Sequence, residues 1–177
     1  MNLLLIGHRG SGKSTVGQLL ATRLDYRFTD TDEIIIEQSG RTIADIFARD
    51  GEQAFRRMEK KVLESLRKAQ SRVISLGGGS VMDPDNRVLV RRLGKVVWLR
   101  APAAVLWSRI SKDPHTSRTR PNLTASGGLA EVESVLEERE PVYQSIANQI
   151  IDTMTMTSEE VADSIEMWFQ ANDMEAG

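Results

Sequence analysis

The chain alternates short apolar runs with amphipathic stretches from its first residues to its last. Each apolar run is followed by a helical pattern, the first of which extends from Ser14 to about Leu24. Because such alternation typically places helices around a parallel sheet, it predicts an α/β fold. In the absence of internal repeats, we expect residues 1–177 to form one domain. The predicted strands lie at residues 3–6, 73–76, 96–99 and 150–151, with a weaker one ending near Phe28.

The segment "GHRGSGKS", residues 7–14, lies between the first apolar run and the helix after it. It matches G-x-x-x-x-G-K-[ST], in which backbone N–H groups and a helix N-terminus surround phosphate oxygens. A dinucleotide-binding fingerprint is excluded, because Thr15 stands where a third glycine is needed. His8 is interpreted as a variable loop position without a catalytic role. The predicted nucleotide contacts are Gly10, Ser11, Gly12, Lys13, Ser14 and Thr15, with Lys13 at the outer phosphates and Ser14 as a Mg²⁺ ligand.

Two aspartates in "FTDTDE", Asp30 and Asp32, are the candidate acids. A phosphate-loop enzyme usually needs a carboxylate for Mg²⁺, often at the end of another strand. Alternation along an extended segment would put both side chains on one side, so that one serves Mg²⁺ and the other meets the substrate. Alternatively, Asp30 or Thr31 caps a helix that starts near Glu33. The two interpretations are compatible.

The segment "EQAFRRMEKKVLESLRKA" has an apolar helical face at positions 55, 58, 62, 66 and 69. Arg57 falls opposite this face, Arg56 lies at its flank, and Glu59 falls inside it. Because a carboxylate on a buried face needs a partner, we expect an i,i+3 pair in which Glu59 holds Arg56 toward a cleft. The alternative is an ordinary surface ion pair.

Residues 111–128, "SKDPHTSRTRPNLTASGG", are polar and show no helical or strand periodicity. Long loops of this kind in a compact domain are usually functional, which predicts a mobile lid.

The composition excludes several classes of protein and site. The net charge of −2 does not suit a nucleic-acid binder, and the absence of cysteine excludes disulfides and thiolate sites. No apolar run approaches the ~20 residues of a membrane span. The start, "MNLLLIGHRG", does not resemble a signal peptide. We therefore expect a cytoplasmic protein without nucleic-acid or membrane partners, and a monomer by default.

The order of these motifs, together with "SLGGGSV", an arginine-proline lid and "REPVY", resembles the shikimate kinase family from residue 2 to about residue 169. The resemblance implies a P-loop NTPase-type three-layer sandwich, with a five-stranded parallel sheet flanked by helices. It also implies transfer of the γ-phosphoryl group of ATP, with Mg²⁺, to the 3-hydroxyl of shikimate, a step toward aromatic amino acids. The substrate-binding region would span residues 30–60.

The resemblance gives roles to single residues. Asp30 matches the acid associated with Mg²⁺, and Asp32 matches the one that holds the substrate hydroxyls and is the candidate general base. Arg56, supported by Glu59, and Arg139 match the two ligands of the shikimate carboxylate. The remaining matches are the aromatic wall of Phe47 and Phe55, the substrate contacts Gly78 and Gly79, and the lid arginine Arg120, which precedes Pro121 and reaches the transferred phosphate.

The resemblance also gives a reason for the three glycines at residues 77–79. In parallel α/β sheets, ligands lie beyond the carboxyl ends of the strands. Three glycines there would let the backbone come close to a small hydroxylated ring and offer it N–H donors, because any Cβ would occupy the substrate's volume. A plain turn would not need three.

The lid departs from the family pattern, with Asn122 and Leu123 after Pro121 where two leucines are usual. Which of Arg109, Arg118 and Arg120 meets adenine therefore stays open. Two other functions also stay open: another small-metabolite kinase, such as a gluconate kinase, and a regulatory module that binds nucleotide without turnover. The combination of D-x-D, F-R-x-x-E and triple glycine favours shikimate.

Overall fold

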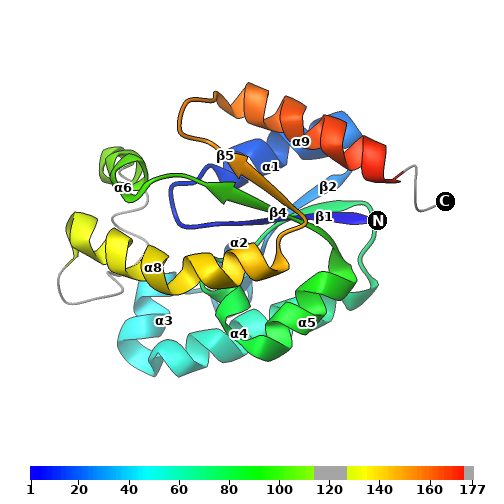
Figure 1. Ribbon diagram of the computed structural model, residues 1–177. Coiled ribbons are helices and arrows are strands. Elements are labelled where there is room, and N and C mark those ends of the chain that lie inside the picture. The colour runs from blue at the N-terminus through cyan, green and yellow to red at the C-terminus, as the bar shows by residue number, and fades with distance from the viewer. Residues whose placement is uncertain (114–126, 174–177) are drawn as a thin grey trace.

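Figure 1 shows the computed structural model of the chain, in which a central sheet separates two layers of helices. The structure describes residues 1–113 and 127–173. Within them, one five-stranded sheet has the order β2-β3-β1-β4-β5, and every neighbouring pair is parallel. The predicted sandwich with a five-stranded parallel sheet is therefore confirmed. The strands are β1 (Asn2–Ile6), β2 (Arg27–Asp30), β3 (Arg72–Ser75), β4 (Gly94–Arg100) and β5 (Gln149–Asp152).

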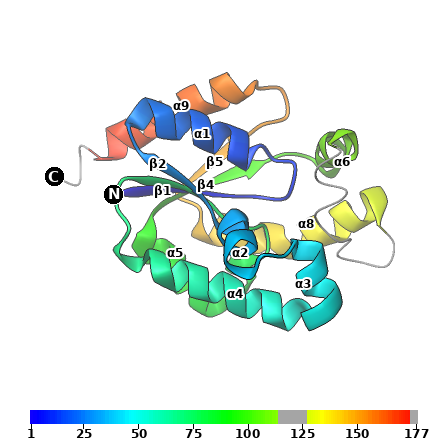
Figure 2. The same ribbon diagram turned by 180° about the vertical axis from the view of Figure 1, so that it is seen from behind.

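The helices cover both faces of the sheet (Figure 2). One layer holds α1 (Lys13–Leu24) and α9 (Ser158–Asp173). The other holds α2 (Thr31–Ser39), α3 (Ile43–Asp50), α4 (Glu52–Ser65), α5 (Pro84–Leu93) and α8 (Gly128–Ile146). The remaining described helices are α6 (Ala103–Lys112) and two 3₁₀ turns, η1 (Leu66–Lys68) and η2 (Ser80–Met82).

The central strand β1 connects the two cores. All five of its residues are buried, and they alternate between the layers. Leu3 and Leu5 pack with α1 and α9, whereas Leu4 and Ile6 pack with the helices of the other layer. A strand buried on both faces reads as a continuous apolar run, which is why its sequence shows no alternation of apolar and polar residues.

The predicted strands are all present, with small shifts at their ends. The weak strand expected to end near Phe28 continues to Asp30, and the next helix begins at Thr31, two residues before the expected start. Most of the predicted lid, residues 114–126, lies outside the described residues. None of the described helices is long and apolar enough to cross a membrane.

The amide of Asn2 connects three segments at the amino end of the sheet. Its Nδ2 donates to the carbonyls of Ala69 and Leu93, both at 2.8 Å, and its Oδ1 accepts from the N–H of Arg72 at 3.1 Å. Asn2 is only 2% exposed, so water cannot replace these bonds. It therefore fixes the starts of β1 and β3 relative to the end of α5.

We expect Asn2→Ala to lower the free energy of unfolding by about 1–3 kcal/mol, because buried backbone groups lose their partners. Urea denaturation measures the change. The control is Asn172→Ala, which removes a single side-chain bond to the carbonyl of Trp168 near the end of α9. It should change stability by less than ~0.5 kcal/mol. Equal losses in the two variants would contradict this role of Asn2.

Candidate active site

The loop after β1 is shaped to hold an anion. Gly10 and Gly12 adopt φ of 81° and 95°, in the left-handed region that favours glycine. Gly12 is the N-cap of α1, and no side chain caps the helix or places an acid in its first turn. Its first N–H groups and the positive end of its dipole therefore face the loop without a competing side chain.

A cavity of about 580 Å³ lies in front of this loop, and we call it the loop cavity. All six predicted nucleotide contacts line it. Lys13 Nζ donates to the carbonyls of Gly7 at 2.9 Å and His8 at 3.1 Å. Arg109 also lines this cavity, and its guanidinium donates to the Gly10 carbonyl at 3.4 Å, to Thr153 Oγ1 at 3.1 Å and to the Thr153 carbonyl at 2.6 Å.

Asp30 and Asp32 both reach the loop cavity, but the predicted reason was wrong. The chain is not extended through residue 32, because α2 begins at Thr31 and Asp32 lies in its first turn. Asp30 is the N-cap: its Oδ1 accepts from the N–H of Asp32 at 2.9 Å. Its Oδ2 accepts from the Ser14 hydroxyl at 3.1 Å. Asp30 therefore caps a helix with one oxygen and faces the phosphate loop with the other.

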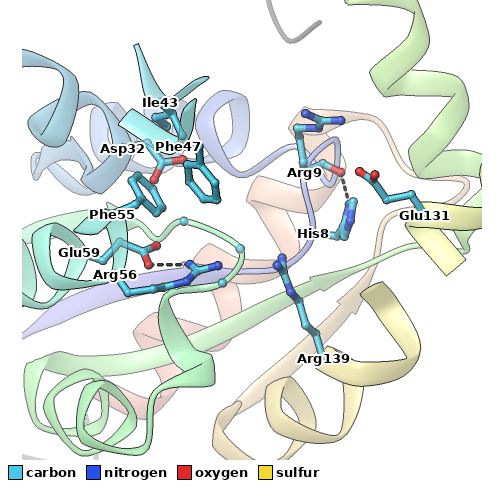
Figure 3. A pocket seen from close by; sticks show the side chains of 13 residues that line it. His8, Arg9, Asp32, Ile43, Phe47, Phe55, Arg56, Glu59, Glu131 and Arg139 are labelled. Atoms are coloured by element: carbon cyan, nitrogen blue, oxygen red, sulfur yellow. Dashed lines mark hydrogen bonds and ion pairs between the residues drawn. The ribbon is translucent and has the colours of Figure 1, made fainter. Parts of the chain in front are cut away.

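A second cavity, which we call the turn cavity, lies against the glycines after β3. Figure 3 shows Arg56 and Arg139 pointing into it from two different helices, with Phe47 and Phe55 beside Asp32. The two phenyl rings are 5.0 Å apart between centroids. The cavity is lined by His8, Arg9, Asp32, Ile43, Phe47, Phe55, Arg56, Glu59, Gly77, Gly78, Gly79, Glu131 and Arg139. Asp32 and Arg9 line both cavities and therefore lie where the two meet.

The predicted ion pair of Arg56 and Glu59 is confirmed. The alternative, an ordinary surface ion pair, is excluded because Glu59 is buried. Arg56 Nη1 lies 2.6 Å from Glu59 Oε2, and the Glu59 side chain is 1% exposed. Ser80 donates its hydroxyl to the other oxygen, Glu59 Oε1, at 2.6 Å, and Asn86 Nδ2 donates to the Ser80 carbonyl at 2.8 Å. Burial raises the pKa of Glu59, while Arg56 and Ser80 oppose part of the rise. Arg57 is exposed, as predicted.

The glycine turn (residues 77–79) needs glycine because charged side chains approach its backbone closely. A Cβ on Gly77 would lie 2.6 Å from Asp32 Oδ1, and one on Gly78 would lie 3.1 Å from Arg139 Nη1. A Cβ on Gly79 would lie 2.7 Å from Arg56 Nη2. None of these glycines has a positive φ. A Cβ on these glycines would therefore displace the side chains that line the cavity, and the expectation that it would also fill the substrate's volume stays a prediction.

His8 lies in the wall of the turn cavity as a neutral base. Burial lowers its pKa to about 4, and the positive charges of Arg139 and Lys13 contribute. Its Nδ1 lies 2.8 Å from the carbonyl of Arg9, so Nδ1 carries the proton and donates. His8 therefore adds no positive charge to the cavity near neutral pH.

Comparison with known proteins identifies the family to which this architecture belongs. The family model for shikimate kinase matches residues 9–170. A shikimate kinase of Syntrophus aciditrophicus is 38% identical over 178 residues, which cover 96% of this chain and 91% of that protein. One of Oleidesulfovibrio alaskensis is 44% identical over 150 residues, covering 85% and 87%. The chain belongs to the shikimate kinase family. The predicted reaction, phosphoryl transfer from ATP to the 3-hydroxyl of shikimate, is that of this family.

The solved structures support the same family. The shikimate kinase of Acinetobacter baumannii in complex with shikimate superimposes with a TM-score of 0.90 at 32% identity, over 97% of this chain and 93% of that one. A gluconokinase of Sinorhizobium meliloti reaches a TM-score of 0.55 at 19% identity, which shows a common fold alone.

Every predicted site residue among the described residues lines one of the two cavities. Arg118 and Arg120 lie outside the described residues, so of the three candidate arginines only Arg109 has a described position. Sequence reasoning did not single out Ser80 or Tyr143 as site residues, although both lie inside quoted motifs. It also missed Glu131 and Thr153, for which the sequence carries no signal beyond the fold.

We expect Arg56→Ala to weaken shikimate binding 30-fold to several thousand-fold. The buried carboxylate of the ligand would lose a charged partner, and truncating one member of such a pair costs about 2–5 kcal/mol. ATP binding should stay nearly unchanged. The matched control is Arg57→Ala, one residue along on the exposed side of α4, which should change either affinity by less than ~0.5 kcal/mol. Calorimetric titration measures both affinities. A loss at Arg57 equal to that at Arg56 would show that Arg56 does not bind the carboxylate.

Proposed function

We propose that shikimate binds in the turn cavity and ATP in the loop cavity, and that phosphoryl transfer takes place where they meet. The observation that carries this assignment is the position of Asp32, which lines both cavities. A group that contacts both substrates must lie at such a junction. The structure in complex with shikimate from Acinetobacter baumannii supports a shikimate site in this fold.

Arg139 and Arg56 are proposed to bind the shikimate carboxylate. Arg139 is 9% exposed, and it has no ion-pair partner among residues 1–113 and 127–173. A buried guanidinium without a protein carboxylate is costly, so an anionic ligand would stabilise it. Arg56 already forms ion pairs with Glu59 and Glu52, which fix the direction of its guanidinium. Together they provide two cations for one carboxylate.

Mg²⁺ is proposed to bind with the nucleotide at Ser14 and Asp30. Hydroxyl and carboxylate oxygens are the ligands that Mg²⁺ prefers, usually one or two from the protein with phosphates and water completing the shell. The described residues contain no group of three Asp, Glu, His or Cys side chains that could hold a metal ion by themselves. When bound, Mg²⁺ neutralises charge on the β- and γ-phosphates.

Catalysis is proposed to rest on positioning and charge. Lys13 would exchange its two carbonyl acceptors for the outer phosphates, and Asp32 would orient the acceptor hydroxyl and take its proton. The buried Phe55 and half-buried Phe47 would limit water at this point. The roles of Arg120, a cytoplasmic location and a monomeric state stay predictions.

The assignment is tested by coupled ADP release with shikimate, gluconate and nucleoside monophosphates as acceptors. We expect turnover with shikimate alone. Turnover with gluconate would instead support the rival metabolite kinase, and nucleotide binding without ADP release would support a regulatory module.

We expect Asp32→Asn to lower kcat by about 10²–10⁴-fold, because the amide keeps the size of the side chain but cannot accept the proton. The affinity for ATP should change much less. Steady-state kinetics with both substrates measures the effect. Retention of most of the turnover would show that Asp32 is not the base.

We expect Asp30→Asn to raise the Mg²⁺ concentration needed for half-maximal activity about tenfold. The asparagine oxygen can still cap α2, so the fold should be kept. Mg²⁺ titration at fixed ATP measures the shift, and Asp85→Asn, at the exposed start of α5, is the control. An unchanged Mg²⁺ requirement would exclude Asp30 as a ligand.

A further inference from the structure

Tyr143 is a buried side chain that contacts the glycine turn from the side of the core. It is 0% exposed, and its ring packs against Trp98 of β4 at 5.7 Å between centroids. Its hydroxyl donates to the carbonyl of Gly78 at 2.5 Å, across 65 positions of sequence. The Gly78 carbonyl therefore points toward the core.

This bond also sets the direction of the next N–H. In a trans peptide, the carbonyl of one residue and the N–H of the following residue point in opposite directions, and no cis peptide bond is present among the described residues. Since the Gly78 carbonyl points to Tyr143 in the core, the N–H of Gly79 points away from the core. Gly79 itself lines the turn cavity, whereas Tyr143 does not.

The two ends of the turn differ in how their N–H groups are bonded. The N–H of Gly77 already donates to Thr31 Oγ1 at 3.1 Å. Neither Gly78 nor Gly79 has an N–H acceptor in the described part of the protein. A backbone donor without a protein acceptor, held at a cavity wall, is available to a ligand.

The same helix carries Arg139, one turn before Tyr143 on α8. A Cβ on Gly78 would lie 3.1 Å from Arg139 Nη1 and 3.5 Å from the Tyr143 hydroxyl, so both side chains reach the same point of the turn. Burial raises the pKa of the Tyr143 phenol, while Arg139 opposes part of the rise, so the hydroxyl keeps its proton and remains a donor.

We propose that Tyr143 is a positioning residue for the acceptor substrate: its hydroxyl holds the Gly78 carbonyl in the core and thereby aims the Gly79 N–H at the bound substrate. By joining the turn to α8, it also fixes the distance between this N–H and the Arg139 guanidinium. The inference rests on the proposed placement of shikimate in the turn cavity.

The test is Tyr143→Phe, which removes the hydroxyl, with its bonds to the Gly78 carbonyl and to Arg139, and keeps the ring contact with Trp98. The KM for shikimate should rise about tenfold, the equivalent of one lost hydrogen bond. The KM for ATP should change less than twofold. The matched control is Tyr26→Phe at the chain's other tyrosine, which packs against Phe169 of α9 and should leave both KM values unchanged. A change below twofold in the KM for shikimate, or equal increases for both substrates, would overturn the proposal.

A measurement on the unaltered protein does not depend on how the variant folds. On addition of shikimate, the amide proton of Gly79 should move downfield in an NMR titration, while that of Gly77, already bonded to Thr31, should move little. A Gly79 resonance that stays in place overturns the role of Tyr143 even if shikimate is turned over. If the unaltered protein neither binds nor phosphorylates shikimate, the proposed function itself fails.

Discussion

Four ionisable side chains from three helices approach the backbone of the glycine turn so closely that a Cβ there would have to displace them. Asp32 comes from α2, Arg56 and Glu59 from α4, and Arg139 from α8. Each would lie within 3.1 Å of a Cβ placed on one of the three glycines. The helices can hold these groups around one small cavity because the backbone between them occupies so little volume.

The two guanidinium groups that reach the turn, those of Arg56 and Arg139, differ in their partners. Glu59 offsets Arg56, and its buried carboxyl is satisfied on both oxygens, by Arg56 and by Ser80. Arg139 has no such acidic partner in the described chain. In the proposed complex, a ligand carboxylate between the two guanidinium groups would give Arg139 an acidic partner, which would favour an acid over a neutral polyol.

Much of this arrangement could be predicted from the sequence, because the strongest signals are local. The phosphate loop follows from fixed spacing between a strand and a helix, and the Arg56–Glu59 pair follows from a three-residue step on one helix. The start of α2 was misplaced, since "FTDTDE" reads equally as a strand end or as a cap, and only pairing of β2 with β3 through Asp30 decides between them. The contact of Tyr143 with Gly78 depends on how α8 crosses the end of β3. No local pattern in the sequence encodes that packing.

The two cavities also differ in how closely they depend on the fold. A strand, a glycine loop and a helix without a capping side chain form the phosphate-facing wall of the loop cavity, and these features can persist in a phosphate-loop protein that shares only the fold. The turn cavity needs a specific turn after β3 and specific side chains on α2, α4 and α8. A gluconokinase of 19% identity therefore shares the fold with this chain, and the fold alone does not specify an acceptor. Asp32 belongs to both cavities because the first turn of α2 lies between them, and in the proposed complex this position would join the general chemistry of phosphate binding to the recognition of one acceptor.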